Sequence, residues 1–96
     1  RPLDRGRLRE PAEQALLALV DEVGPAVEAA ARAGDYRRAF AAAAAFAPAV
    51  DRFFTEVFVM VEDAELRTAR LQLLAALGRT ILRLADLSEL AAGGES

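Results

Sequence analysis

Arginine side chains in the last predicted helix, residues 64–90, indicate two kinds of chemistry. At about 100° per residue along a helix, Arg70 falls inside the arc formed by the leucines of that segment. Arg79 and Arg83 lie one turn apart on the opposite, polar face. A guanidinium in apolar surroundings requires a carboxylate partner, whereas two exposed guanidinium forks suit phosphate oxygens. The segment therefore predicts one structural ion pair and one cationic strip.

The acidic partner of Arg70 is expected just before this segment. Asp51, Glu56 and Asp63 are the candidates, and we predict the pair Arg70–Asp51; direct contact of Arg70 with RNA is the less favoured alternative. Arg67 lies at the edge of the same face and is expected to be more open to solvent.

The cationic strip also has an ordinary structural explanation. On a solvated face Arg83 would pair with Asp86, and surface pairs of this kind contribute little to stability. Tyr36 and the neighbouring Arg37-Arg38, at the start of another helical pattern, are candidates for stacking on a base and for contacting phosphates. The candidate RNA-binding residues are therefore Arg67, Arg79, Arg83, Arg37, Arg38 and Tyr36.

Four phenylalanines are candidate stacking platforms for unpaired bases, because aromatic faces stack on bases in single-stranded RNA. Most of them fit the apolar face of a helix, so a role in the core is favoured: Phe40, Phe53, Phe54 and Phe58.

The composition excludes several classes of catalytic site. The 96 residues include no cysteine and no histidine, which excludes thiol catalysis, disulfides, histidine proton transfer and the usual zinc sites. The acidic pairs Asp21-Glu22 and Glu62-Asp63 are interpreted as solvated helix positions and a helix cap. No catalytic residues, bound metal or cofactor are expected here. No apolar run approaches the length of a membrane span. The chain begins at Arg1 and not at a methionine, which suggests a fragment of a longer protein.

Charge is unevenly distributed along the chain, whose net charge is −3. Residues 1–9 carry four arginines and one aspartate, and residues 64–90 carry four arginines and three acids. Residues 10–33 carry five acids and one arginine. Positive charge is thus concentrated in the first segment and the last helix, which is where nucleic-acid contact would be expected.

The elements that position these residues are all helical. Apolar residues at helical spacing predict a first helix ending at Gly34, with a kink or two abutting helices at Gly24-Pro25. Asp35 is predicted to cap a second helix, which keeps one apolar face through Val61 and bends at Pro48. Asp63 is predicted to cap a third helix.

The predicted fold is thus an all-α bundle of three long, Pro-kinked helices, which can be counted as four or five. Its core face on the third helix comprises Leu66, Leu73, Leu77, Ile81 and Leu84. The predicted divisions are an irregular lead-in at 1–9, a helical domain at 10–90, and a frayed tail at 91–96.

Residues 50–88 carry a resemblance to a known family. Val-Asp-x-Phe-Phe from Val50 leads into Val59-Met60-Val61 and an acidic pair, and the run closes on Ala-Asp-Leu-Ser ending at Ser88. In order and spacing this stretch resembles the C-terminal, DALR-type anticodon-binding domain of the bacterial glycyl-tRNA synthetase β subunit.

The resemblance implies a bacterial, cytoplasmic protein acting in translation. The implied role is to hold the anticodon stem-loop of tRNA(Gly) while the α subunit attaches glycine, with ATP and Mg²⁺ used elsewhere in the parent enzyme. Implied partners are the tRNA, the α subunit and the other domains of the β subunit, with no membrane. Two alternatives remain: the equivalent domain of an arginyl-tRNA synthetase, and a protein-interaction bundle whose Ala-rich face docks another subunit.

Overall fold

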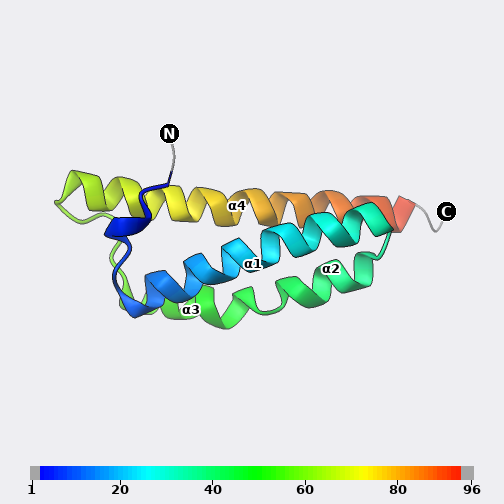
Figure 1. The fold of residues 1–96 in the computed structure, drawn as a ribbon, viewed down its shortest axis with the longest axis horizontal. Coiled ribbons are helices and arrows are strands. Elements are labelled where there is room, and N and C mark those ends of the chain that lie inside the picture. The colour runs from blue at the N-terminus through cyan, green and yellow to red at the C-terminus, as the bar shows by residue number, and fades with distance from the viewer. Residues whose placement is uncertain (1–2, 94–96) are drawn as a thin grey trace.

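The computed structural model describes residues 3–93, with side chains described for residues 3–90, and forms an elongated bundle of three helical rods (Figure 1). A 3₁₀ turn, η1 (Arg5–Arg7), precedes α1 (Pro11–Ala33), α2 (Tyr36–Ala43), α3 (Phe46–Glu56) and α4 (Ala64–Gly93). α1 and α4 run in the same direction, and the α2–α3 rod returns beside α1. The described part contains no strand, so the predicted all-α bundle is confirmed.

α1 is a single helix, not a pair of abutting helices. A capping box joins Glu10 and Glu13 at its start, and Pro11 occupies its first turn, where a missing N–H is tolerated. Pro25 is accommodated inside it. Gly34 ends the helix at φ +71°, the left-handed conformation that glycine adopts without a Cβ penalty.

The second rod is broken rather than bent. The break falls at Ala44-Ala45, between α2 and α3, because Pro48 has no N–H to donate to the carbonyl of Ala44. Pro48 then lies in the first turn of α3, where no donor is needed. The prediction that the helix continues through Phe58 and Val61 is wrong, since α3 ends at Glu56 and Val57 is extended.

α4 determines the length of the molecule. Thirty residues at about 1.5 Å each span most of the 50 Å long axis. The predicted cap is confirmed, because Asp63 Oδ1 accepts the N–H groups of Glu65 (3.1 Å) and Leu66 (3.2 Å). The helix continues to Gly93, into the predicted tail, and residues 94–96 of that tail lie outside the described residues.

The core runs along α1, which contacts every other α-helix. Leu73 and Leu77 of α4 are buried as predicted, but Ile81 is 50% exposed and its predicted core position is wrong. Leu87 continues the buried line instead. Within the lead-in, the described residues form only the 3₁₀ turn η1, yet Leu8 is 1% exposed and is part of the core. The buried apolar set is Leu8, Ala12, Leu16, Val23, Val27, Ala30, Ala39, Phe46, Ala49, Phe53, Val57, Ala69, Leu73, Leu77 and Leu87.

Candidate nucleic-acid interface

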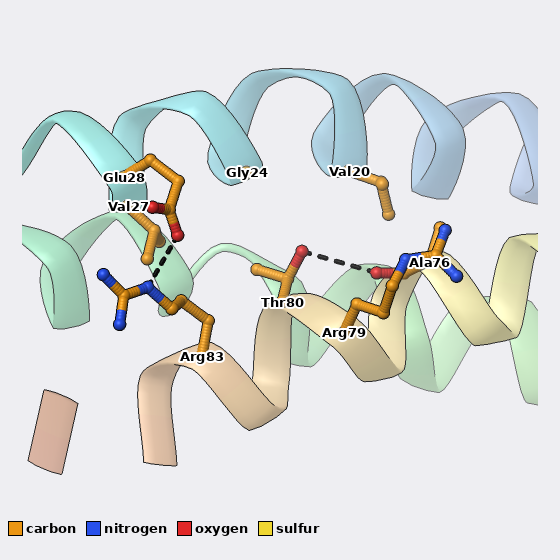
Figure 2. Close-up of a pocket in the computed structure, with 8 residues that line it drawn as sticks. All are labelled: Val20, Gly24, Val27, Glu28, Ala76, Arg79, Thr80 and Arg83. Carbon is orange, nitrogen blue, oxygen red and sulfur yellow. Dashed lines mark hydrogen bonds and ion pairs between the residues drawn. The ribbon is translucent and has the colours of Figure 1, made fainter. Parts of the chain in front are cut away.

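A groove lies between α1 and α4, and two of the candidate arginines line it (Figure 2). Its volume is about 300 Å³. Gly24 of α1 and Ala76 of α4 carry little or no side chain, which leaves room between the helices at this point. Val20 and Val27 supply apolar walls, and polar groups of α4 line the rest: Arg79, Thr80 and Arg83, with Glu28 opposite on α1. The groove therefore combines a small apolar surface with guanidinium groups.

Arg83 crosses the groove to an acid on α1. Its Nε donates to Glu28 Oε1 at 2.7 Å, and the two side chains are 38% and 46% exposed. The predicted partner, Asp86, is wrong. Because this pair is solvated, its attraction is weak, and Arg83 can exchange it for a phosphate at little cost.

Arg79 differs from Arg83 in its surroundings. It is exposed, and among the described residues it makes no ion pair. Its charge is therefore available to a ligand without breaking an existing contact.

Arg67 is partly committed to the protein itself. It is half-buried, and its Nη1 donates to the carbonyl of Val61 at 3.0 Å. The prediction that it is more open than Arg70 is confirmed, but its main observed contact holds the α3–α4 loop.

The remaining candidates lie away from the groove. Arg37 and Arg38 are exposed in the first turn of α2, and the predicted cap beside them is confirmed, since Asp35 Oδ1 accepts the N–H of Arg38 at 3.1 Å. Tyr36 is half-buried and packs against the core, which removes one face of its ring from stacking on a base. None of the three lines the groove between α1 and α4.

Arg70 forms the predicted buried ion pair, but with a different partner. Its Nε donates to Glu13 Oε2 at 2.6 Å, and the side chains are 8% and 1% exposed. A second nitrogen donates to the carbonyl of Phe58. The predicted partner Asp51 is wrong, and Asp51 is exposed. Glu13 is fully engaged, because its Oε1 also accepts the N–H of Glu10 at 3.0 Å.

Two acids that matter most were missed from sequence: Glu13 and Glu28. A signal for Glu13 was present, since it is an acid on the apolar side of the first helix, three residues before the buried Leu16. An acid on one apolar face and an arginine on another indicate a buried ion pair between the two helices, because each charge needs a partner there. Glu28 gave no such signal, because an exposed acid on a helix is ordinary.

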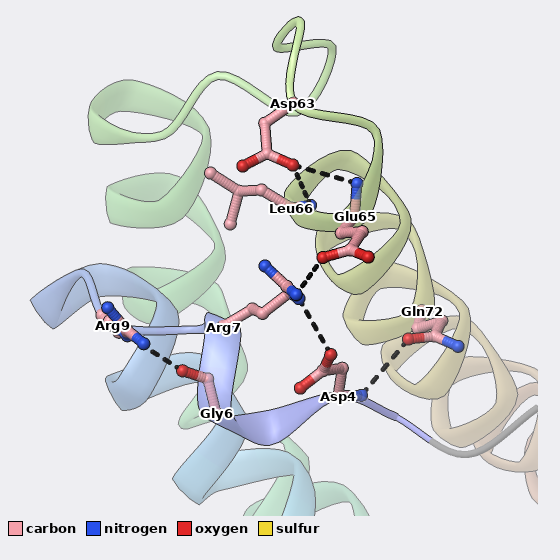
Figure 3. A network of polar contacts seen from close by, with 8 residues as sticks. All are labelled: Asp4, Gly6, Arg7, Arg9, Asp63, Glu65, Leu66 and Gln72. Atoms are coloured by element: carbon pink, nitrogen blue, oxygen red, sulfur yellow. Dashed lines mark hydrogen bonds and ion pairs between the residues drawn. The ribbon is translucent and has the colours of Figure 1, made fainter.

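The lead-in arginines already have intramolecular partners (Figure 3). Arg7 pairs with Asp4 at 3.0 Å and with Glu65 at the start of α4. Arg9 donates to the carbonyl of Gly6 at 3.0 Å, and the N–H of Asp4 donates to Gln72 of α4. The contacts of Asp4 and Arg7 fasten the lead-in to α4, and the charge of Arg7 is neutralised by two acids.

Arg5 and Asp21 form a bidentate ion pair that shifts the pKa of both groups. Two guanidinium nitrogens donate to the carboxylate at 2.6 and 2.9 Å. These hydrogen bonds, aided by the opposite charge, hold the pKa of Asp21 below its ordinary value and raise the pKa of Arg5.

The described residues offer neither a metal-ion site nor a membrane-spanning helix. Residues 3–93 contain no group of three or more His, Cys, Asp or Glu placed to hold a metal ion. None of the helices in this part of the chain is long and apolar enough to cross a membrane.

Comparison with known proteins agrees with the resemblance seen in residues 50–88. The model of the DALR anticodon binding domain matches residues 3–90. Glycine–tRNA ligase β subunits are similar: that of Thiobacillus denitrificans is 49% identical over 89 residues, covering 93% of this chain and 13% of the relative. That of Leptothrix cholodnii is 43% identical over 90 residues, covering 94% and 13%. That of Nitratidesulfovibrio vulgaris is 46% identical over 83 residues, covering 86% and 12%.

This chain therefore spans only about 13% of the length of the first two relatives. No solved structure matches the chain. The named relatives are all glycine–tRNA ligase β subunits, which supports the glycine family over the arginyl alternative. The family match extends over nearly every residue, and the chain therefore belongs to the DALR anticodon-binding domain family.

Proposed function

We propose that this chain is the anticodon-binding domain of a glycyl-tRNA synthetase β subunit. It holds the anticodon stem-loop of tRNA(Gly) while the α subunit attaches glycine to the far end of the tRNA. The observation that carries the proposal is the groove between α1 and α4, where Arg79 and Arg83 stand beside a small apolar surface.

The chemistry of the groove suits an RNA loop. Guanidinium groups bind phosphates through paired N–H donors, and unpaired bases need an apolar or aromatic face to lie against. Arg79 can contact a phosphate directly, whereas Arg83 must first loosen its pair with Glu28. We therefore assign Arg79 and Arg83 to phosphates of the loop backbone.

Binding by this domain alone is expected to be weak. Its net charge is −3, and two arginines of the lead-in, Arg5 and Arg7, are paired with acids. Affinity in the parent enzyme then comes from several contacts on one tRNA, because tethered contacts act at high effective concentration. Arg67, Arg37, Arg38 and Tyr36 stay secondary candidates for such contacts.

The reaction itself belongs to other parts of the parent enzyme. We propose that ATP and Mg²⁺ bind outside this chain, whose described residues offer no acidic cluster for a metal, and that the enzyme works in the bacterial cytoplasm. The proposed partners are tRNA(Gly), the α subunit and the remaining β-subunit domains.

A second function, docking to another part of the synthetase, is favoured by one observation. Large apolar side chains at the α3–α4 loop are exposed, Phe58 most of all. The two functions use different surfaces and are compatible.

The proposal is tested by titrating the chain with a glycine-specific anticodon stem-loop at low salt. A second stem-loop, with the two anticodon cytosines replaced, is titrated in parallel. We expect weak binding that falls with added salt and falls further for the altered loop. Equal binding to both loops would limit the domain to holding phosphates, and no binding to either would refute a role of the isolated domain in anticodon recognition.

A further inference from the structure

We propose that the α3–α4 loop, residues 57–63 (hereafter the tip), together with Phe54, docks into an apolar pocket with a basic rim elsewhere in the same β subunit. The inference rests on the proposed function, in that this chain is one domain of a longer β subunit. It assigns a surface that the RNA-binding role does not use.

The tip and the end of α3 expose three large apolar side chains within seven residues of sequence. Phe58 is 84% exposed and Met60 is 73% exposed, while Phe54 at the end of α3 is 58% exposed. Phe54 meets the buried Phe53 edge to face, with ring centroids 5.5 Å apart, so its exposed ring is supported by the core. The sequence-based preference for a core role is therefore wrong for Phe54 and Phe58. Phe40 is also exposed, at 39%, and only Phe53 of the four is buried.

The backbone that carries these side chains is held from inside the bundle. Arg70, itself paired with Glu13, donates to the carbonyl of Phe58. Arg67 donates to the carbonyl of Val61, and the side chain of Val57 is buried. Asp63, the last residue of the tip, caps α4. A loop fixed in this way presents its apolar side chains without losing further freedom on binding, which favours association.

The charge of residues 51–65, which include the tip, argues against RNA. The arginines beside the tip are already held by the protein: Arg70 by Glu13, Arg7 by Glu65, and Arg67 by the carbonyl of Val61. Between residues 51 and 65 the chain carries five acids and one arginine. Glu56 pairs with Arg52 and Glu65 pairs with Arg7, whereas Asp51 and Glu62 have no ion pair within the described residues. Exposed carboxylates repel phosphates, so a base stacked on Phe58 would bring its backbone into an unfavourable field. Lysines and arginines around an apolar pocket would complement the same surface.

The size of the surface indicates that its partner is tethered. A fully buried aromatic side chain covers about 150–250 Å², so the exposed side chains of the tip bury only a few hundred Å². Stable complexes between separate proteins need more than about 1,000 Å². The same contact suffices within one chain, because tethering supplies a high effective concentration. Since this chain covers only 13% of its relative, most of the β subunit is available as the partner.

The test measures how fast a cysteine at the tip reacts with a maleimide. The chain has no cysteine of its own, so Met60→Cys gives a single site in the isolated chain. Ala33→Cys, exposed at the far end of α1, is the matched control. Both variants are labelled in the isolated chain and in the full β subunit, and labelling is followed by peptide mass, with circular dichroism as the check on folding.

The proposal predicts that Met60→Cys reacts at least about tenfold more slowly in the full subunit than in the isolated chain, which corresponds to about 1.4 kcal/mol of docking. Ala33→Cys should change less than twofold. Equal rates for Met60→Cys in both proteins would overturn the proposal. Protection that appears only after tRNA(Gly) is added would overturn it in favour of base stacking. Phe58→Ser in the full subunit should restore labelling of Met60→Cys.

The outcome is independent of the proposed RNA function. Stem-loop affinity of the isolated chain is measured separately on Phe58→Ser, which should bind as the unmodified chain does. Protection of Met60→Cys without any stem-loop binding would leave the docking surface standing and remove the RNA role.

Discussion

Two arginine–glutamate pairs join α1 to α4, and their surroundings are opposite. Arg70–Glu13 is buried near the tip, whereas Arg83–Glu28 is solvated at the edge of the groove. The two helices run in the same direction, so the two pairs bridge them at successive positions along their length. The pairs differ in how far each is buried. Burial makes the first pair obligatory, because neither charge can be left alone there. Exposure makes the second pair exchangeable. The same two residue types thus fasten a loop in one place and remain available to a ligand in the other.

The largest expected effect is at the buried pair. Arg70→Ala or Glu13→Ala leaves one charge buried without a partner and should cost about 3–5 kcal/mol of the free energy of unfolding. The same truncation at the solvated pair, Arg83→Ala, should cost about 1 kcal/mol or less. Urea denaturation of the three variants measures the difference.

A double variant separates the charge from the packing. Glu13→Leu with Arg70→Met removes both charges and should recover most of the loss, since no unpaired ion remains. Equal losses for Arg70→Ala and Arg83→Ala would mean that burial does not distinguish the two pairs.

The next effect concerns the exchangeable pair. Glu28→Gln removes a negative charge beside Arg79 and Arg83 while keeping the shape of the side chain, so stem-loop affinity should rise about two- to fivefold at low salt. Arg83→Ala should lower it. Fluorescence anisotropy measures both, and a decrease for Glu28→Gln would show that Glu28 contacts the RNA or organises the site.

Asp35 caps α2 and Asp63 caps α4, so the two caps allow a matched comparison of a position far from the tip with one in the tip. Asp35→Ala and Asp63→Ala each remove one cap and should each cost about 1 kcal/mol of stability. Only Asp63→Ala should speed the labelling of Met60→Cys in the full subunit, because Asp63 is the last residue of the tip. Thermal unfolding and the labelling assay together check the pair.

The smallest effect is the pH dependence of the Arg5–Asp21 pair. The pair lowers the folded-state pKa of Asp21. The stabilisation is therefore fully present above the ordinary pKa of an aspartate and is lost as the pH falls through the lowered pKa. Asp21→Asn should therefore reduce stability near neutral pH but show a weaker decline below about pH 4. Urea midpoints of both proteins across the acidic range provide the measurement, and parallel pH profiles would contradict it.

The helices were predictable from sequence because local signals mark their ends. Gly34, Asp35 and Asp63 act as the stop and the caps that their residue types indicate. The end of α3 was not predictable from apolar spacing, since Val57, Phe58 and Val61 continue the helical phase but lie in the loop after the helix. Contacts from Arg70 and Arg67 help to stabilise that loop, and both arginines come from a later helix.

The candidate site was predictable in part. The spacing placed Arg79 and Arg83 together on one face of α4, and the structure places both at one groove. Their acidic neighbour on α1 depends on how two helices pack, which periodicity does not encode. The exposure of Ile81 has the same origin, because the core line of α4 follows the position of α1 rather than the mean apolar direction of the helix.

The most direct test of the account compares one variant from each region in a single binding experiment. Stem-loop affinity at low salt is measured for Arg79→Ala with Arg83→Ala, and for Phe58→Ser with Met60→Ser. We predict that the first double variant weakens binding and flattens its dependence on salt, whereas the second leaves both unchanged. Weaker binding by the tip variant, with the groove variant unaffected, would contradict the assignment of RNA to the groove.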